Sequence, residues 1–274
     1  MNFGKLFSVA LLVCLFSACQ MISGLMKNSG TILNIEVKTD SPNLEETTDK
    51  AVKILQSRLN AFGVSGEVSK TLPNRLEVKI YGEPDLERLK KILLSEGKLE
   101  LIKVVGANNP SPLSTYPTKE AALASIGGKE TSNRRILPYL ERDENSTDKT
   151  DPQANQPKAW VVVESPAIVD GSELRDATAI SRSGNDTDYQ ISFSLKPSGA
   201  QKFGDWTSKN IGSYLAIVFN DQVKSAPYIK SRIDDQGQID GRFTKASAED
   251  LALILKSGYL SATLVLLEEK TFGK

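Results

Sequence analysis

Hydrophobic and polar residues alternate along the segment TILNIEV (31–37), in which every second residue is apolar. This period of two is typical of a strand with one buried face. The next segment, residues 41–64, changes to a helical period. Its apolar positions are Val52, Leu55, Leu59 and Phe62. Ser41 and Pro42 suit the start of this helix, and Gly63 suits its end. A strand followed by a helix is therefore predicted.

The pattern continues through the first third of the chain. Strand-like segments are expected near 66–69 and at 75–81, then a helix at 83–97, then an apolar strand at 98–105. The order β-α-β-β-α-β is the ferredoxin-like arrangement, in which each helix covers the sheet with its apolar stripe. We therefore expect a ferredoxin-like base over residues 31–105.

The second half of the chain predicts a separate mixture of strands and helices. Residues 106–118 break the periodic pattern, and residues 141–158 are polar enough to predict a solvated loop. A helix or turn is expected at 172–180. Strands are expected at 159–165, 189–195, 238–243 and 262–269, and helices at 197–210 and 244–258. The overall prediction is an α+β protein.

A hairpin is predicted at residues 214–229. Asn220 and Asp221 tolerate the positive φ angles that a tight turn requires, and they separate two apolar runs. Pro227 has no N–H to give to a ladder, so its strand is expected to lie at an edge or to end there.

The first apolar run, residues 6–18, follows Lys5 and is shorter than the roughly 20 residues that a membrane-spanning helix needs. It ends in Phe16-Ser17-Ala18-Cys19, which resembles the bacterial lipobox, where cleavage precedes a cysteine that carries lipid. We expect a signal peptide at 1–18, lipidation of Cys19 and a tether at 19–30. There are two alternatives. The segment could be an ordinary secretion signal with an incidental cysteine, or a retained single-span membrane anchor.

Composition narrows the chemistry. The chain has 34 Lys+Arg, 34 Asp+Glu and no histidine. Losing residues 1–18 removes only Lys5, so the mature charge would be 33 − 34 = −1. This balance argues against nucleic-acid binding. The absence of histidine excludes Ser-His-Asp and Cys-His catalysis, and every zinc site that uses a histidine ligand. The two cysteines are Cys14 and Cys19, so processing and lipidation would leave no free thiol. We expect no enzyme activity, no cofactor and no metal site.

Several blocks, in order, suggest a family: LQSRLNAFGVS (55–65), NRLEVKIYGEPDLERLKKIL (74–93), LKPSGAQKFGDWTSKNIG (195–212), LAIVFNDQVKSAPYI (215–229) and EDLALILKSGYL (249–260). Together they resemble the first large periplasmic (P1) region of SecD, a subunit of the bacterial protein-export apparatus. The resemblance implies a ferredoxin-like base with a larger α+β head inserted into it. Residues 31–105 plus 262–269 would form the base, and residues 106–261 the head.

The resemblance also implies a function, with one departure from the family pattern. SecD has membrane helices on both sides of this region, whereas here a lipobox precedes it and no stretch after Cys19 is apolar for about 18 residues. The expected role is a lipid-anchored, non-catalytic domain on the periplasmic side of the cell envelope. Its partners would be unfolded or translocating polypeptide, or Sec components. An envelope lipoprotein that uses the fold for an unrelated partner is the alternative.

The expected contact surface is Ser225-Ala226-Pro227-Tyr228, where an incompletely paired edge could accept an extended peptide. Gln20, rather than aspartate, follows Cys19, which by resemblance to the enterobacterial sorting rule favours the outer membrane over the inner membrane.

Overall fold

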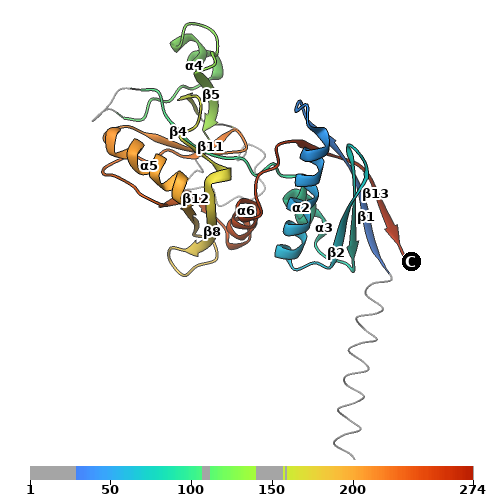
Figure 1. The fold of residues 1–274 in the computed structure, drawn as a ribbon. Coiled ribbons are helices and arrows are strands. Elements are labelled where there is room, and N and C mark those ends of the chain that lie inside the picture. Colours follow the sequence, from blue (N-terminus) through green and yellow to red (C-terminus); the bar gives the residue numbers. More distant parts are fainter. Residues whose placement is uncertain (1–28, 107–111, 140–156, 158, 274) are drawn as a thin grey trace, which may run out of the picture. The chain divides into compact units, whose positions relative to one another are not determined.

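The computed structural model describes residues 29–106, 112–139, 157 and 159–273. They form two compact units, which the chain enters and leaves at Leu94/Ser95 and Leu260/Ser261. We call the unit that contains both described ends the base and the other unit the head (Figure 1). The fold class is α+β, as predicted, with a ferredoxin-like base and an inserted α+β head.

The base is a four-stranded antiparallel sheet with two helices. Its strand order, β13-β1-β3-β2, is the ferredoxin-like order. The elements are β1 (Gly30–Lys38), α2 (Leu44–Phe62), β2 (Gly66–Leu72), β3 (Arg75–Tyr81), α3 (Leu86–Leu94) and β13 (Thr263–Phe272). Alternate strand residues and the apolar stripes of both helices form the core, which includes Leu33, Ile35, Leu55, Leu59, Val78, Ile80, Leu89 and Ile92. The alternation read in the sequence therefore places the core between the sheet and the helices.

The start of α2 differs from the prediction, whereas its end agrees with it. Asn43, and not Ser41, is the N-cap, and the Ser41 hydroxyl accepts a hydrogen bond from the Asn43 N–H at 3.3 Å. The helix ends at Gly63, whose φ of 81° lies in the left-handed region that glycine adopts without strain.

Arg58 is an unexpected member of the base core. Its side chain lies on the buried face of α2 and is fully inaccessible to solvent. One guanidinium nitrogen donates to the carbonyl oxygens of Ile92 (2.9 Å) and Leu93 (3.0 Å), in the last turn of α3. Burial lowers the pKa of Arg58 to about 10, so the side chain is still a cation at neutral pH. Arg58 therefore supplies donors and positive charge to the carbonyl end of a helix.

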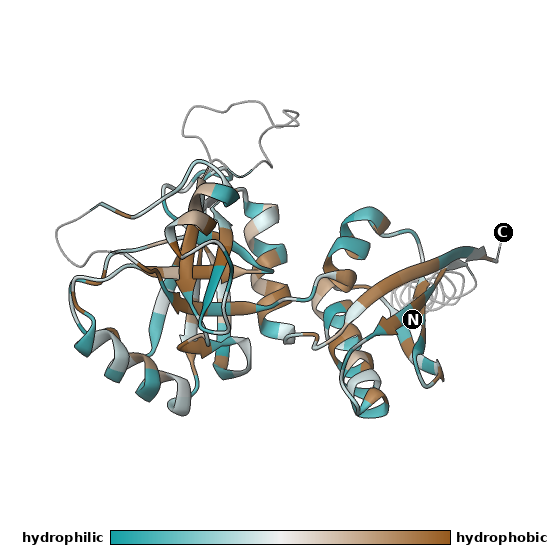
Figure 2. Cartoon of the chain, turned by 90° about the horizontal axis from the view of Figure 1, so that it is seen from above, coloured by the Kyte–Doolittle hydropathy of each residue, from teal (hydrophilic) through white to brown (hydrophobic). Residues whose placement is uncertain are grey.

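In its described residues, the head contains a six-stranded sheet, a three-stranded sheet and three helices. The sheet orders are β6-β5-β11-β10-β4-β7 and β12-β9-β8. The strands are β4 (Leu99–Lys103), β5 (Arg134–Tyr139), β6 (Ala159–Glu164), β7 (Val169–Asp170), β8 (Leu174–Ser181), β9 (Tyr189–Leu195), β10 (Leu215–Phe219), β11 (Gln222–Ser225) and β12 (Gln236–Phe243). The helices are α4 (Lys119–Ser125), α5 (Pro197–Lys209) and α6 (Lys245–Ser257), with a short 3₁₀ turn at Gly171–Glu173. Figure 2 shows the apolar residues concentrated on the strands of each unit.

Among the described residues, the largest core of the head joins the three-stranded sheet, α5 and α6 to strands β4, β7 and β10 of the six-stranded sheet. Phe193 and Ile191 of β9 pack with Phe203 of α5 and Leu251 of α6. Thr244 caps α6 as predicted, because its hydroxyl accepts a hydrogen bond from the Ser247 N–H at 3.2 Å. The alternation in β9 thus buries its apolar face, as the alternation in the base strands does.

Two assignments made from the sequence were wrong. The strand at 98–105 was expected to close the base, but β4 lies in the head sheet between β10 and β7, and β13 is the fourth strand of the base. Four consecutive residues of β4 are buried, which suits a strand covered on both faces. The segment at 172–180 was expected as a helix or turn, but after the short 3₁₀ turn it forms strand β8, paired with β9. Most of the polar stretch 141–158 lies outside the described residues.

Candidate functional site

The predicted hairpin is present at the candidate binding segment. Strands β10 and β11 pair antiparallel, and Asn220 and Asp221 between them have φ angles of 47° and 56°. Strand β11 ends at Ser225, two residues before Pro227. The prediction that this strand ends near the proline is therefore confirmed.

The chain after β11 continues as an extended segment beside the residues that precede β10. The Leu215 N–H donates to the Pro227 carbonyl and the Ile229 N–H donates to the Ser213 carbonyl, both at 3.0 Å. The Gly212 N–H donates to the Ile229 carbonyl at 2.9 Å. One side of the segment is therefore paired with residues 212–215.

The register corrects the role given to Pro227. In an antiparallel ladder, the residue whose carbonyl accepts from Leu215 would also donate its own N–H to Leu215. Pro227 has no N–H, so its missing donor belongs to the paired side of the segment. Ala226 and Tyr228 alternate with it and direct their main-chain groups to the other side. Within the described ranges these groups have no backbone partner.

Strand β11 is not an edge strand, contrary to one reading of the sequence. It lies between β10 and β5 in the six-stranded sheet. Its pairing with β5 is limited to Val223 opposite Tyr139. The sheet therefore covers the start of the hairpin's second arm. The main-chain groups of Ala226 and Tyr228, which have no backbone partner among the described residues, come after it.

The four predicted site residues differ in their accessibility. Pro227 is exposed, whereas Ala226 and Tyr228 are half-buried. Ala226 also packs against the apolar cluster below it. The Ser225 hydroxyl oxygen is buried and has no hydrogen-bond partner among the described atoms, so it does not contribute to a binding surface.

Two further residues extend the surface. The rings of Tyr214 and Tyr228 pack edge to face, with centroids 5.3 Å apart and planes at 67°. Ile211, just before the paired residues 212–215, exposes 56% of its surface. We call Tyr214 and Tyr228, together with Ile211 three residues before Tyr214, the tyrosine patch. Tyr214 was missed because it comes from a different segment, and only the strand register pairs it with Tyr228. Ile211 belongs to that same segment.

Charged and polar contacts fix the hairpin turn to β4. The Asn220 side-chain oxygen accepts from the Lys98 N–H at 2.9 Å, and Lys98 lies 3.3 Å from both Glu100 and Asp221. Arg135 also pairs with Glu100, at 2.9 Å. Burial alone would lower the pKa of Lys98, but Glu100 and Asp221 outweigh it and raise that pKa. These contacts hold the turn, and with it the start of the open segment, in one position.

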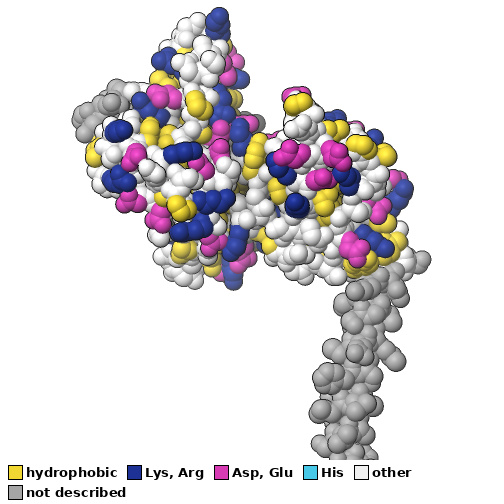
Figure 3. All heavy atoms as spheres, in the orientation of Figure 1, with side chains coloured by type: hydrophobic (Ala, Val, Ile, Leu, Met, Phe, Trp, Pro, Cys, Tyr) yellow, Lys and Arg dark blue, Asp and Glu magenta, His cyan; other side chains and the backbone are white. Residues whose placement is uncertain are grey.

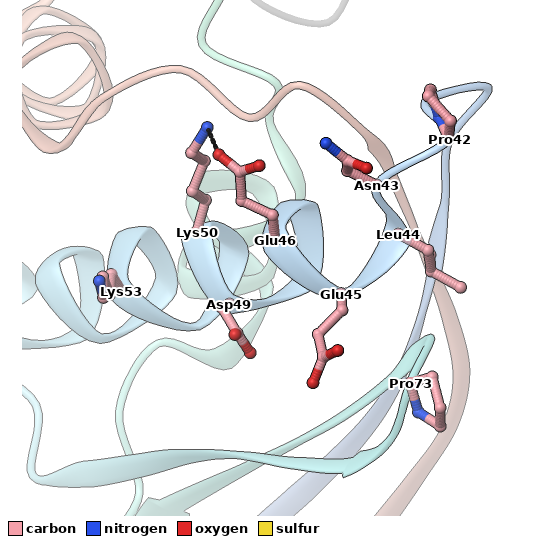
Figure 4. A pocket seen from close by; sticks show the side chains of 9 residues that line it. All are labelled: Pro42, Asn43, Leu44, Glu45, Glu46, Asp49, Lys50, Lys53 and Pro73. Atoms are coloured by element: carbon pink, nitrogen blue, oxygen red, sulfur yellow. Dashed lines mark ion pairs between the residues drawn. The ribbon is translucent and has the colours of Figure 1, made fainter.

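A separate hollow lies at the start of α2 in the base (Figure 4). Its lining is Pro42, Asn43, Leu44, Glu45, Glu46, Asp49, Lys50, Lys53 and Pro73. Its carboxylates are paired with lysines: Glu46 lies 2.7 Å from Lys50, and Lys70 lies 2.5 Å from Asp49 and 3.5 Å from Glu45. Internal pairing of this kind describes a solvated helix end rather than an acid–base pair poised for chemistry.

The remaining expectations concern metal, membrane and charge. Across the described ranges, no three Asp, Glu, Cys or His side chains are grouped closely enough to hold a metal ion. No helix within those ranges is long and apolar enough to cross a bilayer. On the face in Figure 3, basic and acidic side chains are interspersed rather than separated by sign. Cys19 lies outside the described residues.

Comparison with known proteins finds similarity to SecD and SecDF proteins. Residues 145–262 match the family model for the SecDF P1 head subdomain. The chain is 35% identical over 230 residues to protein translocase subunit SecD of Aquifex aeolicus, covering 84% of the chain and 40% of that protein. It is 40% identical over 232 residues to SecD of Elusimicrobium minutum, covering 83% and 47%. The chain thus spans less than half the length of these relatives.

Solved structures agree with the sequence comparisons. SecDF in its super-membrane-facing form superposes with a TM-score of 0.66 and 26% identity, covering 90% of the chain and 31% of that protein. A second structure, described as a membrane component SecDF that enhances protein export, gives a TM-score of 0.61 and 27% identity. It covers 86% of the chain and 98% of that solved chain. The similarity therefore extends over both the base and the head.

Proposed function

We propose that this chain is a non-catalytic envelope protein, lipid-anchored at Cys19, whose SecD-like P1 region binds extended polypeptide through the head as an accessory to protein export. Similarity to SecD over more than four-fifths of the chain supports the link to export. The observation that carries the binding role is the open main chain of Ala226 and Tyr228 beside the tyrosine patch.

The chemistry of this surface suits an unfolded chain. An extended peptide can add to free N–H and C=O groups as an extra strand, which gives affinity for any sequence. Tyr214, Tyr228 and Ile211 add apolar contact beside that strand without requiring a particular partner residue. Weak, sequence-tolerant binding without turnover is the expected behaviour.

Binding can be tested on residues 20–274 by adding a reduced, carboxymethylated, unfolded protein and recording amide shifts. We expect the shifts to cluster at residues 211–214 and 226–229. Tyr228→Ser should weaken binding about tenfold, because truncating an aromatic anchor costs about 1–2 kcal/mol. Tyr259→Ser is the matched control, since Tyr259 is also partly exposed (39%) but lies elsewhere in the chain.

Two outcomes would contradict the proposal. Shifts spread evenly over the head would mean that the patch is not the contact. No shifts at high micromolar polypeptide would favour the alternative, an envelope lipoprotein with an unrelated, specific partner. Crosslinking from position 228 in intact cells would then identify that partner, or a Sec component.

Lipidation rests on the Ser17-Ala18-Cys19 sequence after the apolar run 6–18. Cys19→Ala is expected to abolish the incorporation of labelled fatty acid and to leave the precursor unprocessed. Cys14→Ala is the control and should change neither. Labelled lipid on the Cys19→Ala chain would place the anchor elsewhere. Gln20 favours sorting to the outer membrane, which fractionation of the two membranes tests directly.

A further inference from the structure

One end of the base sheet gathers the first described strand and the last one. Gly30, the first residue of β1, is paired with Phe272 of β13 on one side and with Tyr81 of β3 on the other. The chain therefore enters β1 and leaves β13 at the same end of one sheet (Figure 1). Gly30, at this end of the sheet, therefore directly follows the segment that connects Cys19 to β1.

An aromatic cluster occupies this end on the face opposite the helices. Tyr81 and Phe272 pack edge to face, with ring centroids 6.0 Å apart and planes at 88°. The Lys79 ammonium lies 5.4 Å from the Tyr81 ring centroid and 4.9 Å from that of Phe272. A side chain at Gly30 would place its Cβ 3.0 Å from the Phe272 ring and 1.9 Å from the Ile80 carbonyl oxygen. Glycine therefore lets the ring lie across β1.

These rings are not part of the base core. Strand β3 alternates, and its buried residues Leu76, Val78 and Ile80 lie on the core face. Tyr81 and Lys79 lie between them in the alternation and are half-buried, so they belong to the opposite face. Two aromatic rings on an outer sheet face, with a cation above them, are a feature that the core does not require.

Residue type changes in order along this outer face. The row at the sheet end holds Tyr81, Gly30 and Phe272, and the next row on the same face holds Lys79, Ile32 and Lys270. On β2, Glu67 is paired with Lys79 in this second row, and its carboxylate accepts a hydrogen bond from the Tyr81 hydroxyl at 3.4 Å. The third row adds Glu77 and Glu268 beside Asn34. Lys270 reaches back to Glu268 at 2.8 Å. From the end of the sheet inward, aromatic rings are therefore followed by lysines. The same order is found in proteins that contact the headgroup layer of a bilayer.

Chain length places a membrane within reach. Only residues 20–29 separate Cys19 from Gly30, and they can extend to roughly 35 Å. The mature charge of −1 would not hold the protein on a membrane by itself, so a contact at this end would orient an anchored protein rather than recruit it.

We propose that the sheet-end cluster, Gly30, Ile32, Lys79, Tyr81, Lys270 and Phe272, contacts the headgroup layer of the membrane that holds the chain. The rings enter the layer and the two lysines contact lipid phosphate groups. This contact fixes the orientation of the base on the bilayer. The inference rests on the lipid anchor of the proposed function, and it extends that proposal by giving the base a surface of its own.

Site-directed fluorescence on the full, lipidated chain tests this contact. The processed chain would carry no free thiol, so one introduced cysteine can be labelled. Glu83→Cys places the dye two residues beyond Tyr81, and Leu72→Cys places it at the opposite end of the sheet, where Leu72 pairs with Arg75. In phosphatidylcholine vesicles containing headgroup-nitroxide lipid, quenching at 83 should be several-fold stronger than at 72.

Variants then decide whether the cluster makes the contact. Tyr81→Ala with Phe272→Ala should reduce quenching at 83 to the level at 72. Lys79→Gln with Lys270→Gln, which leaves both rings, should reduce it in part and serves if the ring variant fails to fold. Equal quenching at 72 and 83 would overturn the inference. So would quenching at 83 that neither double substitution changes. If the chain floats with vesicles but shows equal quenching at 72 and 83, the anchor stands and only the membrane contact is refuted. If the chain does not float, both the anchor and the contact are refuted.

Discussion

Replacing Arg58 by alanine is expected to lower the free energy of unfolding of the base by about 3–6 kcal/mol, because each carbonyl that loses a buried donor costs about 1–3 kcal/mol and packing is lost as well. Arg58 donates to Ile92 and Leu93 at 2.9 and 3.0 Å and is fully buried. Both tryptophans, Trp160 and Trp206, lie in the head. Their fluorescence therefore follows the head, and hydrogen exchange at the amides of α2 and β3 follows the base.

Arg58→Met separates the two contributions. Methionine keeps much of the apolar stem but removes the donors, so its cost should be smaller than that of alanine and should reflect mainly the two carbonyls. Equal exchange rates in Arg58→Ala and the unsubstituted chain would show that the last turn of α3 does not need this side chain.

The pH dependence of the Arg58 effect has a definite sign. Burial lowers the pKa of Arg58 to about 10, below its ordinary value, so between the folded-state and unfolded-state pKa values the unfolded chain holds the proton that the folded chain has released. Stability from this group therefore rises with pH only inside that window and is constant below it. The difference between the unsubstituted chain and Arg58→Met should not change between about pH 6 and 9.

Leu59→Ala is expected to destabilise the base by about 2–5 kcal/mol, the range for a buried leucine whose removal leaves a cavity. Leu59 is fully buried on the apolar stripe of α2. Leu72→Ala is the matched control, because Leu72 is 58% exposed and should change stability by less than about 0.5 kcal/mol. Exchange rates in α2 report the effect. Equal effects of the two substitutions would mean that the α2 register is wrong.

Leu59 and Arg58 show which parts of the fold the sequence predicts. Leu59 belongs to a run with one clear period, and such a run identifies both the helix and its buried face. Arg58 is its neighbour in the chain, and a lone arginine normally indicates a solvated position. Its burial depends on the carbonyls of α3, which are 34 and 35 residues away. No local pattern contains that information.

Strand partners are harder to predict than strands. The apolar run at 98–105 indicates a strand, but nothing within it states which sheet receives it, and β4 joined the head. The candidate site shows the same limit. Asn220-Asp221 predicts the turn from local chemistry, whereas the direction of the main-chain groups of Ala226 and Tyr228 depends on register with residues 212–215. Tyr214 is paired with Tyr228 only through that register.

The position of β13 in the chain has a consequence for biosynthesis. Strand β1 lies inside the base sheet, between β13 and β3. The Asn34 side chain of β1 donates a hydrogen bond to Glu268 of β13, which is 234 residues later in the sequence. During synthesis and export, the whole head must therefore follow β1 before β13 can close the base sheet. The head, which is continuous in sequence, can complete its fold first. Until β13 arrives, one edge of β1 stays unpaired, so this is the interval in which a nascent chain is most exposed to wrong strand partners.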